Sequence, residues 1–456
     1  MQKITILGGG PAGYAAALYA DHFDLEVTLI EADGIGGTCL NRGCIPAKHW
    51  LHVAEVNREL NTAGDLGINV QKISNDWEKT ANKRGEVISK LTGGVSSLLK
   101  AKNVNIVEGW GKLVDKNTIS VTKTDGAQEE FKSDYILLAT GSIPRPLQGF
   151  EFDSSFVISS DEALDWVEPP KKVCIVGAGA IGCEFASLLV DLDSETIVVE
   201  LEKEILPGMD KRTAGELRKQ LTKRGGKFKL ETSIKSINKE KKEVTFSDGT
   251  SEQFDSVLIS IGRSPLTDSI GLDDLGVKRI NDFVEVDLSS FQTSIPNIYA
   301  AGDIVAGTPQ LAHVGFAEGI AAITHMATKE KADINYDAIP SVVYTSPEVA
   351  EVGINSENAK AEDIKISHAQ HSFVGIGRAI IQNQNNGIVK VFYEEDGPIV
   401  GASICGPDAG EVIHELMYMV GWEVLPKEAA DFIHAHPTLS EAVGEALMSA
   451  SGRGLH

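Results

Sequence analysis

The chain has 456 residues, of which 42% are hydrophobic and 23% charged, and its 65 acidic and 42 basic residues give a formal net charge of −23. Its length exceeds what one hydrophobic core usually supports, so we expect about three or four domains. The acidic balance argues against nucleic acid as a partner, and no apolar run reaches the roughly 20 residues of a membrane span. An apolar strand begins at residue 4, which leaves no room for a signal or transit peptide, so we expect a cytoplasmic protein.

A short apolar strand at residues 4–7 leads into the glycine-rich turn GGGPAG, an alanine-rich helix and a second strand, VTLIE, that ends at Glu31. Gly8, Gly10 and Gly13 have the spacing of a dinucleotide-binding turn. Glycines let the backbone approach a pyrophosphate at a helix N-terminus, and the carboxylate of Glu31 can accept both hydroxyls of an adenosine ribose. A turn that binds nothing is the alternative, but the order of strand, glycines, helix, strand and acid favours a dinucleotide site.

Residues 34–48, GIGGTCLNRGCIPAK, hold Cys39 and Cys44 with four residues between them. This spacing is neither that of a zinc knuckle nor that of a thioredoxin-type pair. On an ideal helix the two Cα atoms would be at least roughly 7.5 Å apart, too far for a disulfide, so we expect the neighbouring glycines to distort the backbone. Pro46 is expected at the first position of a helix that continues through Leu60, which places Cys44 near a helix N-terminus, where a thiolate is favoured.

Two interpretations of this cysteine pair follow. A strained, accessible disulfide would exchange easily, and Arg42 and Lys48 add positive charge that favours a thiolate. The alternative is a pair of thiols in a reduced loop that perform no chemistry. Cys174, Cys183 and Cys405 lie in apolar or glycine-rich surroundings and are expected to be buried thiols, and a total of five cysteines does not suit a secreted disulfide framework.

The dinucleotide pattern returns in residues 172–200, where KVCIV leads into GAGAIG, a helix and the strand TIVVE, which ends at Glu200. Gly177, Gly179 and Gly182 repeat the glycine spacing, and in both copies the acid comes 18 positions after the third glycine. Two such sites suggest two cofactors, and flavin plus nicotinamide is the obvious pair. Glu200 would repel a 2′-phosphate, and the following LEKEILP contains no arginine, so NAD is favoured over NADP.

The segment between the two copies is expected to form a helix around residues 77–99 and then a β-rich piece that ends in YILLATGS, residues 135–142. This strand and turn can close over the first cofactor, although ATGS is also an ordinary strand-to-turn ending. After the second copy, the strand NIYAAGD ends at Asp303, and a helix opens at about Leu311. Asp303 could hydrogen-bond a ribitol hydroxyl, or it could be a turn or N-cap aspartate.

From residue 339 onward, alternating strands with helices near 410–421 and 426–433 predict an α+β interface domain. It closes with HAHPTLSEAVGEALM, in which Glu441 follows His436 by five residues. A histidine before a proline at a helix start, with a glutamate about one turn on, can be an oriented general base. The HAH sequence could equally be a surface pair or a stray metal contact.

Taken together, these motifs resemble those of the pyridine nucleotide-disulfide oxidoreductases. The resemblance runs nearly end to end and rests on GGGPAG, GGTCLNRGCIPAK, ATGS, GAGAIGCE, NIYAAGD, LAHVGFAEG, IPSVVYTSPEVAEVG and HAHPTLSEA. It implies an α/β fold with two Rossmann-like domains, for FAD and for NAD, and a C-terminal α+β dimerisation domain. The implied boundaries are 1-145 for the FAD-binding domain with the redox disulfide, 146-265 for the NAD-binding domain, 266-338 for a central domain completing the FAD site, and 339-456 for the interface domain.

The resemblance also implies roles for individual residues. Cys39 would be the interchange thiol that meets a dithiol substrate, and Cys44 the thiolate beside the flavin. Lys48 would lie near flavin N5 and pair with Glu184. A catalytic base would come from the partner subunit, which implies a homodimer. That base and the carboxylate holding it would be His436 and Glu441.

The cofactor-binding positions follow in the same way, and the resemblance implies no metal site. The positions that would hold FAD are Gly8, Gly10, Gly13, Glu31, Thr38, Lys48, Gly111, Thr140, Gly141, Ser142, Asp303 and Ala312. The positions that would hold NAD are Gly177, Gly179, Ile181, Gly182, Glu184, Glu200 and Gly262.

Within the family, HPTLSEA and CLNRGCIP favour the branch that oxidises dihydrolipoyl groups to the disulfide form while NAD⁺ is reduced to NADH. The implied partner is a lipoylated carrier protein of a 2-oxo acid dehydrogenase or glycine cleavage complex, with no nucleic acid and no membrane. One alternative is a related reductase of another disulfide or of a metal ion. Another is a flavoprotein retained as a scaffold or NADH sensor, against which the presence of Cys39, Cys44 and His436 counts.

Some positions depart from the usual family pattern. They leave room for altered substrate access or redox potential near the disulfide, and none of them is a predicted catalytic residue. These positions are Arg42, Ala47, His49, Trp50 and Ser346.

Overall fold

The computed structural model describes residues 1–455, which form two compact units. Unit 1 consists of Met1–Ala47, Trp77–Arg145 and Gly262–Ile334. Unit 2 consists of Lys48–Asp76, Pro146–Ile261 and Asn335–His456. Each unit is described by itself, and the four-part division drawn from the sequence stays a prediction.

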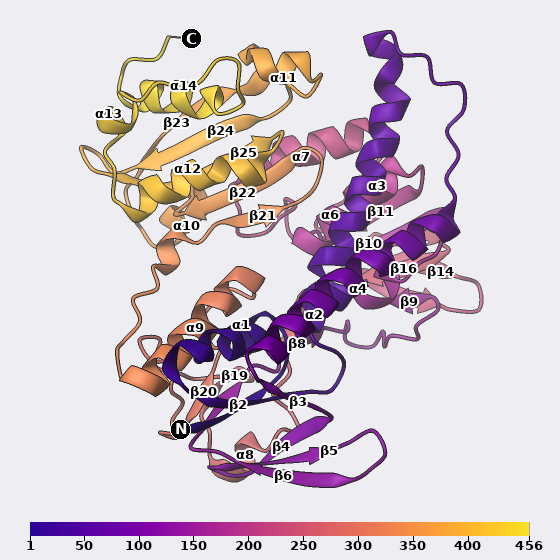
Figure 1. The fold of residues 1–456 in the computed structure, drawn as a ribbon. Helices are drawn as coiled ribbons and strands as arrows, with labels where there is room; N and C mark the ends of the chain where they lie inside the picture. The colour runs from indigo at the N-terminus through magenta and orange to yellow at the C-terminus, as the bar shows by residue number, and fades with distance from the viewer. Residues whose placement is uncertain (456) are drawn as a thin grey trace. The chain divides into compact units, whose positions relative to one another are not determined.

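Unit 1 is built on a five-stranded parallel sheet of strand order β20-β7-β1-β2-β3. Figure 1 labels β20, β2 and β3 of this sheet. Its strands are β1 (Lys3–Leu7), β2 (Glu26–Glu31), β3 (Asn105–Glu108), β7 (Tyr135–Leu138) and β20 (Ile298–Ala300). The interior strand segments are nearly continuously apolar because the sheet is covered on both faces. The glycine turn after β1 opens helix α1 (Pro11–Tyr19), as the first dinucleotide motif predicts.

Alternate side chains of the strands point to different layers. Ile6 and Leu137 pack with helices α1, α4 (Trp77–Ala101) and α9 (Ala312–Thr328) in one core. Ile136 and Leu138 pack in a second core with an antiparallel three-stranded sheet. That sheet consists of β4 (Trp110–Asp115), β5 (Thr118–Thr122) and β6 (Gln128–Lys132). The helices predicted around residue 77 and at about Leu311 are therefore confirmed.

The first half of unit 2 repeats this architecture, with a parallel sheet of order β12-β11-β10-β16-β9 and an antiparallel sheet of order β13-β14-β15. The parallel strands are β9 (Val157–Ile158), β10 (Lys172–Val176), β11 (Glu195–Val199), β12 (Lys227–Lys229) and β16 (Ser256–Ile259). The antiparallel strands are β13 (Ile234–Asn238), β14 (Glu243–Phe246) and β15 (Ser251–Gln253). Helix α6 (Ala180–Asp191) follows the second glycine turn as α1 follows the first. The two predicted dinucleotide folds are confirmed, and they share one strand arrangement.

The second half of unit 2 is an antiparallel sheet of order β21-β22-β25-β24-β23, the α+β domain that the sequence predicts. Its strands are β21 (Ser341–Val343), β22 (Glu348–Gly353), β23 (Ser367–Ser372), β24 (Ile388–Tyr393) and β25 (Ile399–Gly406). Helix α12 (Ala409–Gly421) packs on β22 and β25, and α14 (Glu441–Ala450) packs on β23 and β24, in one shared core.

One helix is shorter than predicted. The sequence places a helix over residues 426–433, but α13 ends after four residues (Pro426–Ala429). Phe432 and Ile433 follow it with exposed side chains, 73% and 98% accessible in the single chain. The last four residues of the predicted helix therefore lie outside it, and the two large apolar side chains among them are exposed.

The remaining shorter elements connect these layers. They are α2 (Gly37–Arg42), β8 (Ser142–Pro144), α5 (Ser160–Leu164), α7 (Lys211–Lys223), β17 (Arg263–Pro265), α8 (Leu272–Leu275), β18 (Arg279–Ile280), β19 (Phe283–Val284), α10 (Ser356–Ala361) and α11 (Gly377–Ile381). Helix α3 spans Cys44–Thr62. Among residues 1–455, no helix is both long enough and apolar enough to cross a membrane.

A buried carboxylate in β22 makes the stability of unit 2 depend on pH. Glu348 Oε2 accepts a hydrogen bond from the backbone N–H of Gly410 at 2.8 Å. The pKa of Glu348 is raised from 4.5 to about 7, mainly by burial and also by negative charges at Asp408, Glu411 and Glu55, against the lowering effect of the Gly410 N–H. The folded state therefore binds this proton more tightly than the unfolded chain.

We expect the free energy of unfolding to fall as the pH rises from about 4.5 to about 7, and to stay low above that, as far as Glu348 contributes. Glu348→Gln keeps an oxygen for Gly410 without the charge, so it should stabilise the protein at pH values above 7 by about 1–3 kcal/mol and flatten this pH dependence. Denaturant unfolding across pH measures it. The exposed Glu395→Gln is the matched control, and equal profiles for both variants would contradict the assignment.

Candidate active site

The first glycine turn is shaped by contacts of backbone on backbone. A Cβ atom at Gly8 would lie 2.1 Å from the carbonyl oxygen of Ala139, and one at Gly13 would lie 1.8 Å from the carbonyl oxygen of Gly8. A Cβ atom at Gly10 would meet only the Cα atom of Gly37, at an ordinary 3.8 Å. Gly8 is thus required by the close approach of the residues after β7, and Gly13 by the packing of α1 on the turn, while Gly10 leaves an open cradle at the N-terminus of α1 where a pyrophosphate fits.

The acid at the end of β2 is already oriented by the chain. Glu31 Oε2 accepts the backbone N–H of Gly9 at 2.6 Å, and Oε1 accepts that of Asp33 at 2.7 Å. Burial raises the pKa of Glu31, and the N–H of Gly9 opposes that rise. A carboxylate has about four acceptor positions, so Glu31 keeps capacity for the two ribose hydroxyls.

The second turn reproduces this geometry in unit 2. A Cβ atom at Gly182 would lie 2.0 Å from the carbonyl oxygen of Gly177, whereas one at Gly179 would meet nothing within 4 Å. Glu200 Oε2 accepts the N–H of Ala178 at 2.7 Å, and its Oε1 accepts that of Glu202 at 3.0 Å. The residues present therefore fit a second dinucleotide as well as they fit the first.

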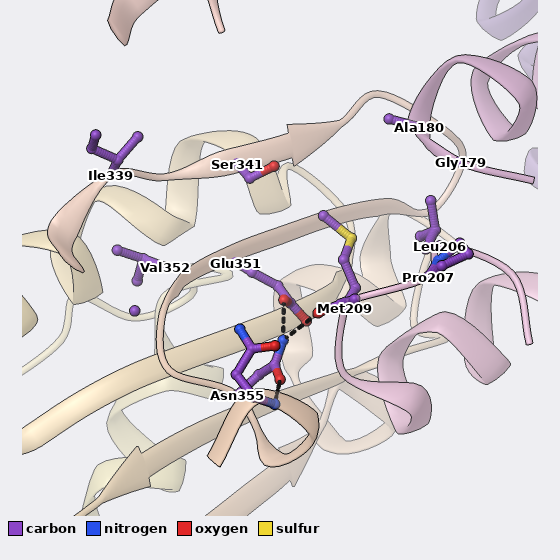
Figure 2. A pocket seen from close by; sticks show the side chains of 13 residues that line it. Gly179, Ala180, Leu206, Pro207, Met209, Ile339, Ser341, Glu351, Val352 and Asn355 are labelled. Carbon is purple, nitrogen blue, oxygen red and sulfur yellow. Dashed lines mark hydrogen bonds between the residues drawn. The ribbon is translucent and has the colours of Figure 1, made fainter. Parts of the chain in front are cut away.

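A cavity of about 400 Å³ adjoins this second turn (Figure 2). Gly179 and Ala180 line it together with the loop 206–209 and with residues of β21, β22 and α10. On its floor, Asn355 Nδ2 donates to Glu351 Oε2 and to the carbonyl oxygen of Gly208, each at 2.9 Å. These bonds fix the loop beside the N-terminus of α6, the end of the helix that favours a phosphate.

Other predicted flavin positions meet within unit 1. Ser142 Oγ donates to Asp303 Oδ2 at 2.6 Å, and Arg263 Nε donates to Ser142 Oγ at 2.7 Å. Thr140 Oγ1 donates to the carbonyl oxygen of Leu266 at 2.6 Å. The sequence analysis did not single out Arg263, which directly follows Gly262 and is 121 residues from Ser142 in the chain.

The remaining predicted cofactor positions are distributed over helices, a strand and two tight turns. Gly111 lies in β4, where an added Cβ atom would meet the end of the Leu7 side chain at 2.5 Å, so packing favours glycine there. Gly141 and Gly262 have positive φ angles of 73° and 108°, which favour glycine. The others lie in α2 (Thr38), α6 (Ile181) and at the start of α9 (Ala312).

The two cysteines of residues 34–48 lie on either side of a helix break. Cys39 is in α2, which ends at Gly43 with φ −140° and ψ −111°, and Cys44 is the first residue of α3. The predicted distortion and the position of Cys44 at a helix N-terminus are confirmed. The helix begins two residues earlier than predicted, because Pro46 can occupy the first turn, where no N–H is needed by an intrahelical bond.

Tyr14 connects these cysteines to the first glycine turn. Burial, together with charges on Cys39 and Cys44, raises the pKa of Tyr14 to about 12. The Tyr14 ring packs edge-on against Phe316, with centroids 5.5 Å apart. The sequence missed Tyr14, although its place directly after the third glycine of the turn was a usable signal.

Cys39 and Cys44 are more exposed to solvent than the other three cysteines. Cys39 and Cys44 are half-buried. Cys174, Cys183 and Cys405 are buried, as predicted, and burial raises the pKa of their thiols, which favours the protonated form.

An ion pair in unit 2 joins α3 to α6. Lys48 Nζ lies 3.0 Å from both carboxylate oxygens of Glu184, and Glu184 Oε1 also accepts the backbone N–H of Tyr344 at 3.0 Å. Lys48 Nζ is 4.3 Å from the centroid of the Tyr344 ring. The sequence predicted the pair from resemblance but not the aromatic ring beneath it, which is a favourable cation–π partner.

The C-terminal histidine is paired as the sequence predicts. His436 Nδ1 lies 2.8 Å from Glu441 Oε1, and Glu441 Oε2 accepts the N–H of Thr438 at 2.9 Å. The net effect lowers the pKa of Glu441, because these two contacts outweigh its slight burial. The His436 side chain is 76% exposed in the single chain, so its Nε2 side is open to an approaching group.

Three of the positions that depart from the family pattern, Trp50, Arg42 and Ser346, have partners elsewhere in the chain. Trp50 is 2% exposed and donates from Nε1 to the carbonyl oxygen of Leu164 at 3.3 Å. Arg42 forms an ion pair with Asp33. The carbonyl oxygen of Ser346 accepts a hydrogen bond from Arg224, and its N–H donates to Ser187 Oγ at 2.9 Å. Within the part of the chain that the structure describes, no group of three or more His, Cys, Asp or Glu side chains is placed to hold a metal.

Comparison with known proteins places the chain in a family. Residues 2–319 match the pyridine nucleotide-disulphide oxidoreductases, and residues 339–447 match the dimerisation domain of the same proteins. The chain belongs to this family, and FAD and NAD, the predicted cofactors, are the cofactors of its members. The resemblance drawn from the motifs is therefore confirmed.

Individual relatives cover nearly the whole chain. Dihydrolipoyl dehydrogenase of Bacillus subtilis is 34% identical over 99% of this chain and 98% of its own length. A leghemoglobin reductase of Vigna unguiculata is 37% identical over 98% of this chain and 87% of its own. The crystal structure of LpdA from Mycobacterium tuberculosis matches with a TM-score of 0.91 and 28% identity, covering 98% of this chain and 99% of that one.

A pair of glycine substitutions tests the assignment of the first turn. Gly13→Ala forces a Cβ atom onto a carbonyl oxygen and should destabilise the fold by about 1–3 kcal/mol or more. Gly10→Ala has room for its Cβ atom and an extended backbone that alanine adopts, so the fold should persist while FAD is lost. Thermal unfolding and the flavin content of the purified proteins measure both effects. Full flavin content in Gly10→Ala would contradict the assignment of the FAD pyrophosphate to the turn at Gly10.

Proposed function

We propose that the protein is a dihydrolipoyl dehydrogenase, which oxidises dihydrolipoyl groups to the disulfide form and reduces NAD⁺ to NADH. The observation that carries this proposal is the cysteine pair astride the break at Gly43, with Cys44 opening α3. The break removes the helical separation that would hold the two sulfurs apart, and the helix N-terminus favours the thiolate of Cys44. Relatives of this name from Bacillus subtilis and Arabidopsis thaliana support the choice of substrate.

Cys39 and Cys44 exchange their disulfide with the substrate dithiol. A thiolate of the dihydrolipoyl group attacks Cys39 Sγ, which breaks the bond between the two cysteines and leaves Cys44 as the thiolate. The second substrate thiolate then attacks the substrate sulfur bound to Cys39, which closes the lipoyl disulfide and releases Cys39. Two electrons have moved from the substrate to the cysteine pair, and two thiol protons have been released.

His436 is the proposed base for the first of these protons. Its Nδ1 faces the carboxylate of Glu441, so Nε2 is the nitrogen that accepts the proton of the substrate thiol. Glu441 holds the ring in this orientation and stabilises the imidazolium that forms. An imidazole suits this step because its ordinary pKa of about 6.5 lets it take and return a proton near neutral pH.

The cofactor positions follow the two repeated folds. When bound, FAD supplies the group that accepts the two electrons of the cysteine pair and passes them as hydride to NAD⁺. We assign FAD to the turn that contains Gly10 and to Glu31, and NAD to the turn that contains Gly179 and to Glu200. Lys48, fixed by Glu184, is the cation proposed to face the flavin.

We further propose a homodimer in which the base of one subunit serves the cysteines of the other. The chain contains a dimerisation domain, and Phe432 and Ile433, just before the histidines, expose apolar surface that a second copy would cover. The carrier is a lipoylated protein of a 2-oxo acid dehydrogenase or glycine cleavage complex, and a cytoplasmic location stays a prediction. Reduction of a different disulfide, of a metal ion or of a haem protein is the alternative, since some relatives are named leghemoglobin reductase.

A substitution at the proposed base separates the lipoyl reaction from the nicotinamide reaction. His436→Gln should lower kcat for NADH formation from dihydrolipoamide by roughly 10²–10⁴-fold, the usual contribution of a general base. The NADH-dependent reduction of an artificial acceptor such as ferricyanide should be unchanged, because it needs no thiol proton. His414→Gln, an exposed histidine of α12, is the matched control. Full lipoyl activity in His436→Gln, or none in the unaltered protein, would refute the proposal.

A further inference from the structure

A second histidine–carboxylate pair lies beside the proposed base in unit 2. His434 stands two residues before His436 in the same loop, and its Nε2 lies 3.1 Å from Glu415 Oε2. Glu415 belongs to α12, whereas the partner of His436, Glu441, is the first residue of α14. The loop therefore carries two imidazoles that two different helices hold.

The two imidazoles differ in burial. The side chain of His434 is 16% exposed, against 76% for His436. His434 is thus a packed residue of unit 2, while His436 projects from it. Because the ring of His434 is mostly enclosed by the chain and that of His436 is not, we assign contact with the substrate to His436 and not to His434.

The His434 ring packs directly against Gly444 of helix α14. A Cβ atom added at Gly444 would lie 2.6 Å from His434 Nδ1 and 3.1 Å from its Cε1, distances at which the ring would have to move. The glycine in the middle of α14 is unfavourable for a helix by about 1 kcal/mol relative to alanine, and the ring contact explains its presence. His434 is held by the carboxylate of α12 on one side and by the backbone of α14 on the other.

The two pairs also interact electrostatically. The hydrogen bond with Glu415 raises the pKa of His434 against its partial burial, and the charge of Glu441 adds to the rise. In return, His434 is one of the groups that lower the pKa of Glu441, after Thr438 and His436. His434 therefore favours the ionised form of the carboxylate that orients His436.

We propose that His434, clamped between Glu415 and Gly444, is a positioning residue that fixes the loop of the base and the first turn of α14 as one unit. This inference rests on the proposed function, since it concerns the proton acceptor of the lipoyl reaction. Without the contacts of His434, His436 and Glu441 are both still present, but the loop can shift relative to α14. A misplacement of the base by about 1 Å can cost roughly 100-fold in rate.

The two half-reactions of the holoenzyme, followed separately by stopped flow, test the clamp. Glu415→Ala removes the carboxylate and Gly444→Ala displaces the ring, so each should slow reduction by dihydrolipoamide by about tenfold or more. Reduction of the same proteins by NADH, which needs no thiol proton, should stay unchanged. Glu415→Gln keeps an oxygen that accepts the Nε2–H bond and should recover most of the lost rate. Glu411→Ala, exposed one turn earlier on α12, is the matched control.

The outcomes are distinguishable. Slowing confined to the dihydrolipoamide half-reaction, with recovery in Glu415→Gln, supports the clamp. Equal slowing of both half-reactions, or no slowing in Glu415→Ala and Gly444→Ala, overturns it. An unaltered protein that NADH reduces and dihydrolipoamide does not would overturn the proposed function, and this inference with it.

Discussion

The architecture depends on close contact between backbones at two glycine turns. At each turn the third glycine lies against the carbonyl oxygen of the first, at distances that no side chain would permit. This contact brings a helix N-terminus to the end of a parallel strand and leaves the middle glycine facing open space. The carboxylate that ends the next strand is tied to the same turn by a backbone N–H in both copies. The same contact between the third and the first glycine of a turn thus shapes both proposed cofactor sites.

The proposed reactive side chains lie where helices are interrupted or end. The break at Gly43 separates Cys39, in α2, from Cys44, which opens α3, and Lys48 of α3 pairs with Glu184. The loop after α13 exposes His436, while the first residue of α14 orients it. Regular elements thus fix the positions of the reactive groups, and the breaks between them leave those groups accessible.

Much of this could be predicted because the signals are local. The glycine spacings, the acid 18 positions later and the five-residue step from His436 to Glu441 are all short-range patterns, and the structure contains the geometry that they imply. Long-range contacts carried no such signal. The bond of Arg263 to Ser142 and that of Trp50 to the carbonyl oxygen of Leu164 depend on packing between distant segments. The end of α13 was misplaced because Phe432 and Ile433 are apolar yet exposed.

The most direct test follows Cys39 and Cys44 themselves. Oxidised holoenzyme is treated anaerobically with stoichiometric dihydrolipoamide and then with NAD⁺, and after each step the cysteines are alkylated and identified by mass spectrometry while NADH is followed by absorbance. The account predicts that both thiols become reactive after dihydrolipoamide and are protected again as NADH forms. A pair that stays protected from dihydrolipoamide, in a protein whose flavin NADH reduces, would contradict the proposed electron path.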